Sequence, residues 1–175
     1  MTTHLVVVDL QHVFADPDSG WYVPRVAEIV EPIERLVAAS DPHVTFTRFV
    51  ADPTPTGAWR AYYEQWPFAR VAADDPLYAL IEPFSGRPTL DVPTFGKWGP
   101  ALAERVDDEL ILAGVSTDCC VISTALPAAD SGVRVLVASD ACAGATDVTH
   151  AQALDVMRLY APLIEVRTTG ELLGS

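Results

Sequence analysis

The chain has 175 residues and a formal net charge of −13, and half of its residues are hydrophobic. This length and hydrophobic content predict one globular domain over residues 1–175 and exclude a disordered chain. The acidic balance disfavours nucleic acid and anionic membrane surfaces as partners, because their phosphates would be repelled. No apolar run approaches the roughly eighteen residues of a membrane-spanning helix, so we expect no membrane partner.

Cysteine usage indicates the compartment. There are three cysteines, an odd number, and two of them are adjacent, which does not fit a disulfide framework. The first four residues show neither a basic segment nor the start of a signal-length apolar run. We therefore expect a cytoplasmic protein.

Short apolar runs alternate along the chain with stretches of helical periodicity. Strands are expected over residues 4–8, 44–49, 88–92, 109–113, 133–138 and 163–167, and helices over residues 23–39, 100–106, 121–131 and 147–160. Pro32 should kink or split the first helix. Residues 52–93 are the least regular and are either a substrate-facing excursion or a plain surface loop. The alternation predicts an α/β fold, a three-layer α/β/α sandwich around a central, mainly parallel sheet.

In such a sheet, ligands bind at the carboxyl ends of the strands. This rule selects Asp9, Arg48, the turn over residues 116–120, and Asp140 together with Cys142. An acid, a base and a thiol are therefore expected along one edge of the sheet.

Two adjacent thiols, Cys119 and Cys120, stand where the predicted strand over residues 109–113 gives way to a helix. Backbone N–H groups and the positive end of a helix dipole favour a thiolate at such a place. The alternative is that both are buried small hydrophobes, as most free cysteines are. Local patterning does not separate one thiol from the other.

A thiol of ordinary pKa needs a base or a nearby cation to act as a nucleophile at neutral pH. Asp9, at the end of the first strand, is the candidate base, although a loop-ordering carboxylate would look the same. Lys97 is the candidate cation. It is the only lysine among eleven basic residues, and aromatic residues and glycines surround it in the sequence. A lone surface lysine is the alternative.

Taken together, these residues resemble the isochorismatase-like cysteine hydrolases, a superfamily that includes nicotinamidases, N-carbamoylsarcosine amidases and isochorismatase. The resemblance covers nearly the whole chain and implies a Rossmann-like sheet. The segments that carry it are Asp9-Leu10-Gln11, Lys97, Gly114-x-x-Thr117-Asp118-x-Cys120-Val121-x-x-Thr124-Ala125, and Asp140-Ala141.

The resemblance implies a role for each matching residue. Cys120 is the nucleophile, Asp9 the base, and Lys97 the cation that holds Asp9. The backbone N–H groups of Ser116 and Cys120 form the oxyanion hole, and the Val115–Ser116 peptide is expected to be cis. Cys119 then falls on a variable position that packs or lines the pocket, and Cys142 is only a runner-up nucleophile.

The same resemblance implies hydrolysis of a C–N bond in a small amide or ureido compound through a cysteine thioester, in a homo-oligomer. One alternative is a vinyl-ether hydrolase of the isochorismatase type, in which Asp9 acts as the acid. Another is a non-catalytic binding or scaffold member, although the presence of Asp9, Lys97 and Cys120 argues against it.

The sequence departs from the nicotinamidase pattern at the metal-binding residues. Where an Asp-x-His pair is expected, the chain has Asp52 followed by Thr54. The four histidines, His4, His12, His43 and His150, show no ligand spacing, and one carboxylate does not make a site. We therefore predict no metal and no other cofactor.

The candidate substrate-binding residues are Gln11, Phe14, Arg48, Trp59, Trp98 and Cys119. Arg48 or Arg60 could bind a substrate carboxylate in bidentate fashion, or either could be structural. The aromatic residues over 59–66 have helical spacing, Trp59, Tyr62, Tyr63 and Trp66. They either line the pocket or form a helix face packed on the core or on another subunit.

Overall fold

The computed structural model describes residues 3–174. Its centre is one parallel sheet of six strands in the order β3-β2-β1-β4-β5-β6. The strands are β1 (Thr3–Val8), β2 (Val44–Phe49), β3 (Thr89–Val92), β4 (Glu109–Val115), β5 (Arg134–Ala143) and β6 (Ile164–Arg167). The helices are α1 (His12–Ala15), α2 (Val26–Ser40), α3 (Ala58–Gln65), α4 (Pro100–Ala103), α5 (Ile122–Asp130), α6 (Asp147–Arg158) and α7 (Thr169–Leu173).

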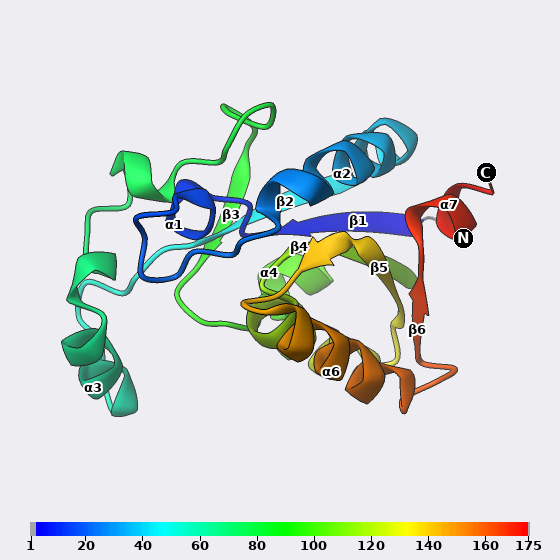
Figure 1. Cartoon of the computed structure of the whole chain (residues 1–175). Coiled ribbons are helices and arrows are strands. Elements are labelled where there is room, and N and C mark those ends of the chain that lie inside the picture. Colours follow the sequence, from blue (N-terminus) through cyan, green and yellow to red (C-terminus); the bar gives the residue numbers. More distant parts are fainter. Residues whose placement is uncertain (1–2, 175) are drawn as a thin grey trace.

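Alternate residues of the central strands feed two separate cores. On β1, Leu5 and Val7 pack with α2 on one face, whereas Val6 and Val8 pack with α5 and α6 on the other. Figure 1 shows α2 and α6 on opposite sides of the sheet. Because both faces are covered, the inner strands are apolar throughout, as parallel strands usually are. The predicted three-layer α/β/α fold is confirmed.

Several predicted elements have other bounds in the structure, among them one helix and one strand. The helix expected over residues 23–39 begins at Val26 and runs through Pro32 without a break. Burial of Ile29, Ile33 and Leu36 outweighs the hydrogen bond that a proline removes. The strand expected to end near residue 138 continues to Ala143, after a register shift in its pairing with β4.

The irregular region carries α3 and two single helical turns, η1 (Pro67–Ala69) and η2 (Pro76–Tyr78). In Figure 1, α3 stands apart from the three layers at the end of long connections. Its buried ring, Tyr63, belongs to the same hydrophobic core as α2. The excursion is therefore tied to the body by aromatic packing.

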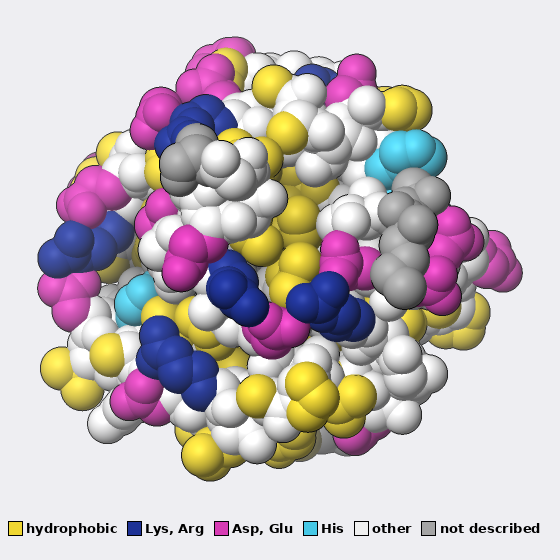
Figure 2. All heavy atoms as spheres, turned by 90° about the vertical axis from the view of Figure 1, so that its right-hand side faces the viewer, with side chains coloured by type: hydrophobic (Ala, Val, Ile, Leu, Met, Phe, Trp, Pro, Cys, Tyr) yellow, Lys and Arg dark blue, Asp and Glu magenta, His cyan; other side chains and the backbone are white. Residues whose placement is uncertain are grey.

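Figure 2 shows the face that carries the two chain ends, where basic side chains stand next to acidic ones. Arg134, the first residue of β5, pairs with Glu109 and Glu165, at 2.8 and 2.6 Å. Within residues 3–174, no helix is both long and apolar enough to cross a bilayer.

Candidate active site

Asp9 follows β1 directly and has a φ of +49°. Few residues other than glycine adopt this left-handed conformation, although aspartate does so more readily than most, and strained residues of this kind cluster at functional sites. Thr47 on β2 holds the carboxylate, because its hydroxyl donates to Asp9 Oδ1 at 2.8 Å and accepts from Asp9 N at 3.2 Å. The strained backbone and this anchor together fix where the second carboxylate oxygen points.

That second oxygen, Asp9 Oδ2, lies 2.9 Å from Lys97 Nζ, and both side chains are fully buried. The ammonium donates its hydrogen bond to Thr94 O, at 2.6 Å, and lies 5.2 Å from the centre of the Phe49 ring. Apart from the Lys97 ammonium, no nitrogen or oxygen donor within residues 3–174 reaches Oδ2 with hydrogen-bond geometry. A carboxylate oxygen has two lone pairs, so one lone pair of Oδ2 remains able to accept a proton.

The loop that carries Lys97 is locked to the helix that follows the cysteines. Thr124 on α5 accepts from Lys97 N at 2.9 Å and donates to Cys120 O at 2.7 Å. A Cβ on Gly96 would come within 2.5 Å of Ser123 O. Only glycine permits this close approach. One threonine thus links the backbones of two predicted catalytic residues.

The two cysteines lie in η3 (Thr117–Val121), a single wide π-type turn between β4 and α5. Just before this turn, Gly114 has a φ of +106°, and a Cβ there would lie 2.2 Å from Val8 O. The Val115–Ser116 peptide is cis, as the family resemblance implies. The turn therefore lies at the carboxyl end of β1, close to Asp9.

The first residues of the turn are tied to the loop after β5. Asp118 Oδ1 accepts from the Ser116 hydroxyl and, at 3.0 Å, from Ala145 N. Although burial opposes ionisation of this carboxyl, these hydrogen bonds hold the pKa of Asp118 below its usual value. His150 Nδ1 lies 2.8 Å from the hydroxyl of Thr117. The turn is therefore braced on both sides.

The two thiols differ in exposure. Cys120 is 2 % exposed, whereas Cys119 is open to solvent. Burial and then the Asp9 carboxylate raise the pKa of the Cys120 thiol well above its usual range, and Lys97 opposes the shift. Burial and the charge of Asp118 raise the pKa of Cys119 as well. The resting form of Cys120 is thus the protonated thiol, next to a carboxylate that can accept its proton.

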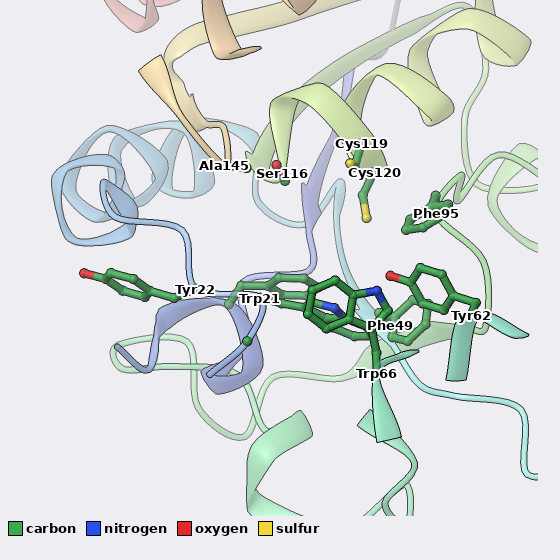
Figure 3. A pocket seen from close by; sticks show the side chains of 12 residues that line it. Trp21, Tyr22, Phe49, Tyr62, Trp66, Phe95, Ser116, Cys119, Cys120 and Ala145 are labelled. Atoms are coloured by element: carbon green, nitrogen blue, oxygen red, sulfur yellow. The ribbon is translucent and has the colours of Figure 1, made fainter. Parts of the chain in front are cut away.

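Both thiols open onto a cavity of about 210 Å³. Its walls are mainly aromatic, with Phe14, Trp21, Tyr22, Phe49, Tyr62, Trp66 and Phe95. The other lining residues are Gly20, Ser116, Cys119, Cys120 and Ala145. In Figure 3 the Cys120 sulfur points into the cavity, and the rings of Trp21, Trp66 and Tyr62 lie across from it. The cavity thus presents an aromatic wall to the candidate nucleophile.

Among the predicted substrate-binding residues, Phe14 and Cys119 line this cavity, and Gln11 and Arg48 do not. The fully buried Gln11 amide donates to Phe49 O and Tyr78 O and accepts from Phe49 N, so both of its N–H donors are used by the backbone. Arg48 forms a bidentate ion pair with Asp91 on β3, at 2.8 and 2.6 Å. Successive side chains of a strand point to opposite faces of the sheet. Because Thr47 points toward Asp9, Arg48 points away from it.

The prediction for Trp59 and Trp98 also needs correction. Trp59 stacks on Tyr63 at 5.9 Å and contacts Phe95 at 5.4 Å, so it supports the wall without forming its surface. Trp98 packs on the core that α5 and α6 cover. Large rings beside a pocket often serve as its second layer.

The two other residues expected at the edge lie elsewhere because β5 is longer than predicted. Asp140 accepts from Thr169 N and from the Thr169 hydroxyl, at 2.6 and 2.9 Å, and so anchors α7. Cys142 is buried within the strand, and burial raises the pKa of its thiol to about 12. Neither side chain lines the cavity.

The residues around Asp52 do not fit a metal site. Asp52 Oδ1 accepts from the backbone and hydroxyl of Thr54, at 2.8 and 3.2 Å. No group of three or more His, Cys, Asp or Glu side chains suited to a metal occurs within the described chain. The absence of a catalytic metal stays a prediction.

Several residues of the site carry no signal of their own in the sequence. Thr47 and Thr124 are single polar residues in apolar segments, and only their contacts reveal that they position Asp9 and Lys97. Tyr62 lies on α3 and Trp66 directly follows that helix, four residues later. Their helical spacing alone predicts that they lie on the same face. Phe95 and Trp21 come from separate loops that only the fold brings together.

Known proteins with the same architecture were found by sequence and by structure. The Isochorismatase domain model matches residues 3–169. The isochorismatase family protein YecD of Escherichia coli O157:H7 is 28% identical, over 99% of this chain and 96% of its own.

Two solved structures extend the comparison. A cysteine hydrolase from Pseudomonas syringae pv. phaseolicola 1448A superposes with a TM-score of 0.84 at 26% identity, covering 99% of this chain and 91% of that one. An N-carbamoylsarcosine amidase from Thermoplasma acidophilum shares the fold, with a TM-score of 0.73 at 21% identity and 97% coverage of both chains. Because the Isochorismatase domain model matches almost the whole of this chain, the chain belongs to the isochorismatase family and is a hydrolase.

Proposed function

We propose that the protein is a metal-independent cysteine hydrolase that cleaves a C–N bond in a small amide or ureido compound. The observation that carries this proposal is the buried Asp9–Lys97 ion pair, which interacts with the Cys120 thiol and leaves a lone pair of Asp9 Oδ2 to accept its proton. The amidase and cysteine hydrolase among the structural relatives support it.

In the first half-reaction, Cys120 Sγ attacks the carbonyl carbon while the thiol proton passes to Asp9. The resulting oxyanion accepts hydrogen bonds from the backbone N–H groups of Ser116 and Cys120. When the tetrahedral intermediate collapses, the C–N bond breaks, and Asp9 returns the proton to the leaving nitrogen. The acyl group is left on sulfur as a thioester.

In the second half-reaction, Asp9 takes a proton from water, and the hydroxide attacks the thioester carbon. The C–S bond then breaks, and the sulfur recovers the proton held by Asp9. Lys97 keeps Asp9 charged and oriented between the steps. Because the pKa of the resting thiol is high, proton transfer has to accompany sulfur attack.

Hydroxylamine provides a direct test. It competes with water for a thioester and yields a hydroxamate, which ferric ion reveals by colour. We expect hydroxamate from benzamide with the native enzyme and with the Cys119→Ala control, but none with Cys120→Ala. Hydrolysis without any acyl transfer would contradict the thioester and favour chemistry that uses Asp9 alone as the acid.

The predicted cytoplasmic location and homo-oligomer are part of the same proposal. Static light scattering on the purified protein measures the mass in solution directly. A monomer at micromolar concentration would overturn the homo-oligomer prediction and leave the chemistry at Cys120 untouched.

A further inference from the structure

We infer that the substrate is an amide whose acyl part is uncharged, apolar and flat, and that the cavity rejects amides carrying a carboxylate. This inference rests on the proposed function, because it concerns what binds beside Cys120. It follows from the composition of the cavity wall and from the contacts that hold Lys97, Arg48 and Arg60.

The wall offers no charge to a bound anion. Within residues 3–174, no Lys, Arg, His, Asp or Glu side chain lines the cavity. A carboxylate moved from water into such surroundings loses its hydration and gains no partner, which disfavours its binding. An uncharged ring loses little on entering and buries its apolar surface.

The nearby cations are already engaged. Lys97 is paired with Asp9. Arg48 is held by Asp91, and Arg60 Nε donates to Pro55 O at 3.2 Å. Recruiting Lys97 or Arg48 to a substrate carboxylate would break an existing ion pair, and Arg60 is an exposed side chain outside the cavity wall. The cavity therefore lacks the guanidinium that recognition of a carboxylate usually requires.

The aromatic walls favour a flat group. Trp21 and Trp66 meet with centroids 6.3 Å apart and planes at 62°, and Tyr62 and Phe95 meet at 5.7 Å and 89°. Rings at steep angles present faces on one side and edges on another, which suits a planar guest. In Figure 3 the Tyr62 hydroxyl points from this wall toward the thiols. Burial and the thiols raise the pKa of Tyr62, so the hydroxyl stays protonated and able to donate to the amide.

The test compares three amides of one scaffold, namely benzamide, 4-nitrobenzamide and 4-carboxybenzamide. The nitro group has the shape of a carboxylate but no net charge, so it controls for size. We expect kcat/KM for 4-carboxybenzamide to be about 100-fold or more below that for 4-nitrobenzamide. Equal values for the two would overturn the inference.

A variant shifts the selectivity in a predictable direction. Trp66→Arg places a guanidinium on the wall. It should reduce the ratio of kcat/KM for 4-nitrobenzamide to kcat/KM for 4-carboxybenzamide about 10-fold or more. Gln65→Arg is the matched control, since it adds the same charge one residue away at an exposed position outside the wall. An equal change in both variants would indicate long-range attraction and contradict recognition at the wall.

Binding to Cys120→Ala, measured by calorimetry, separates this inference from the proposed function. If the uncharged amides bind and the carboxylate does not, the wall selects as proposed even when no amide is turned over. If amides are hydrolysed but 4-carboxybenzamide binds as well as its nitro analogue, the function stands and the selectivity is wrong.

Discussion

Thr47 is the residue on which the orientation of Asp9 depends. Its hydroxyl is the donor to Asp9 Oδ1, and without it the carboxylate could rotate about its last bond. We expect Thr47→Val to lower kcat about 10-fold or more and leave KM nearly unchanged, because the lost contact positions a base and does not touch substrate. Steady-state kinetics on benzamide measure both values.

Thr45→Val is the matched control for this prediction. Thr45 lies on the same strand and pairs with His4, at 2.9 Å and near the opposite end of β2 from Asp9. It should change stability without changing kcat. Equal losses of kcat in the two variants would show that β2 packing, and not the bond to Asp9, sets the rate.

Removing the charge of Lys97 tests whether its interaction with Asp9 is electrostatic or only a packing contact. Lys97→Met keeps the apolar stem but leaves Asp9 buried without a counter-ion, which favours the protonated acid. We expect kcat/KM to fall about 100-fold or more and the remaining activity to rise toward alkaline pH. A pH–rate profile unchanged in shape would contradict the assigned pairing.

At the scale of elements, Gly114 allows β4 to pass close to β1. A methyl group there would meet Val8 O and also face a left-handed backbone. We expect Gly114→Ala to lower the free energy of unfolding by roughly 3–5 kcal/mol. Urea denaturation followed by circular dichroism measures this value.

Gly132→Ala separates the two causes of that loss. Gly132 has a φ of +93°, but no atom lies within 4 Å of the place that an alanine methyl would occupy, so only backbone strain applies. Its cost should be about 1–2 kcal/mol. If both variants lost the same amount, the contact between β1 and β4 would not be what requires glycine at residue 114.

The aromatic residues over 59–66 combine the two roles that the sequence left open. Tyr62 and Trp66 line the cavity, whereas Tyr63 is buried and Trp59 stacks behind the wall. Helical spacing placed the four on one face of α3. It could not divide that face, because the division depends on where Phe95 and Trp21 approach from other loops.

For the whole molecule, the pKa values of two histidines, one buried and one half-buried, make the free energy of unfolding depend on pH. Burial, followed by His43 and Arg105, lowers the pKa of His4, and burial lowers that of His150. Below the unfolded pKa near 6.5 the unfolded chain binds protons that the folded chain does not, so stability falls as pH falls. We expect a lower free energy of unfolding at pH 5.5 than at pH 7.5.

His4→Gln tests this origin, since an amide can keep the contact with Thr45 but does not titrate. Its free energy of unfolding should vary less between the two pH values than that of the native chain. His150 contributes to the variation that remains. An unaltered pH dependence in His4→Gln would exclude His4 as a source.

The sequence by itself determined the layered fold and the motif residues. Apolar periodicity and strand–helix alternation are local and repeat along the chain, and Asp9, Lys97 and Cys120 stand in recognisable segments. Only the tertiary structure decided what surrounds them. Gln11 and Arg48 found partners on neighbouring elements, at Phe49 and Asp91, because pairing in space sets which polar groups stay free. The aromatic cavity likewise exists only where separate loops converge, which no local pattern encodes.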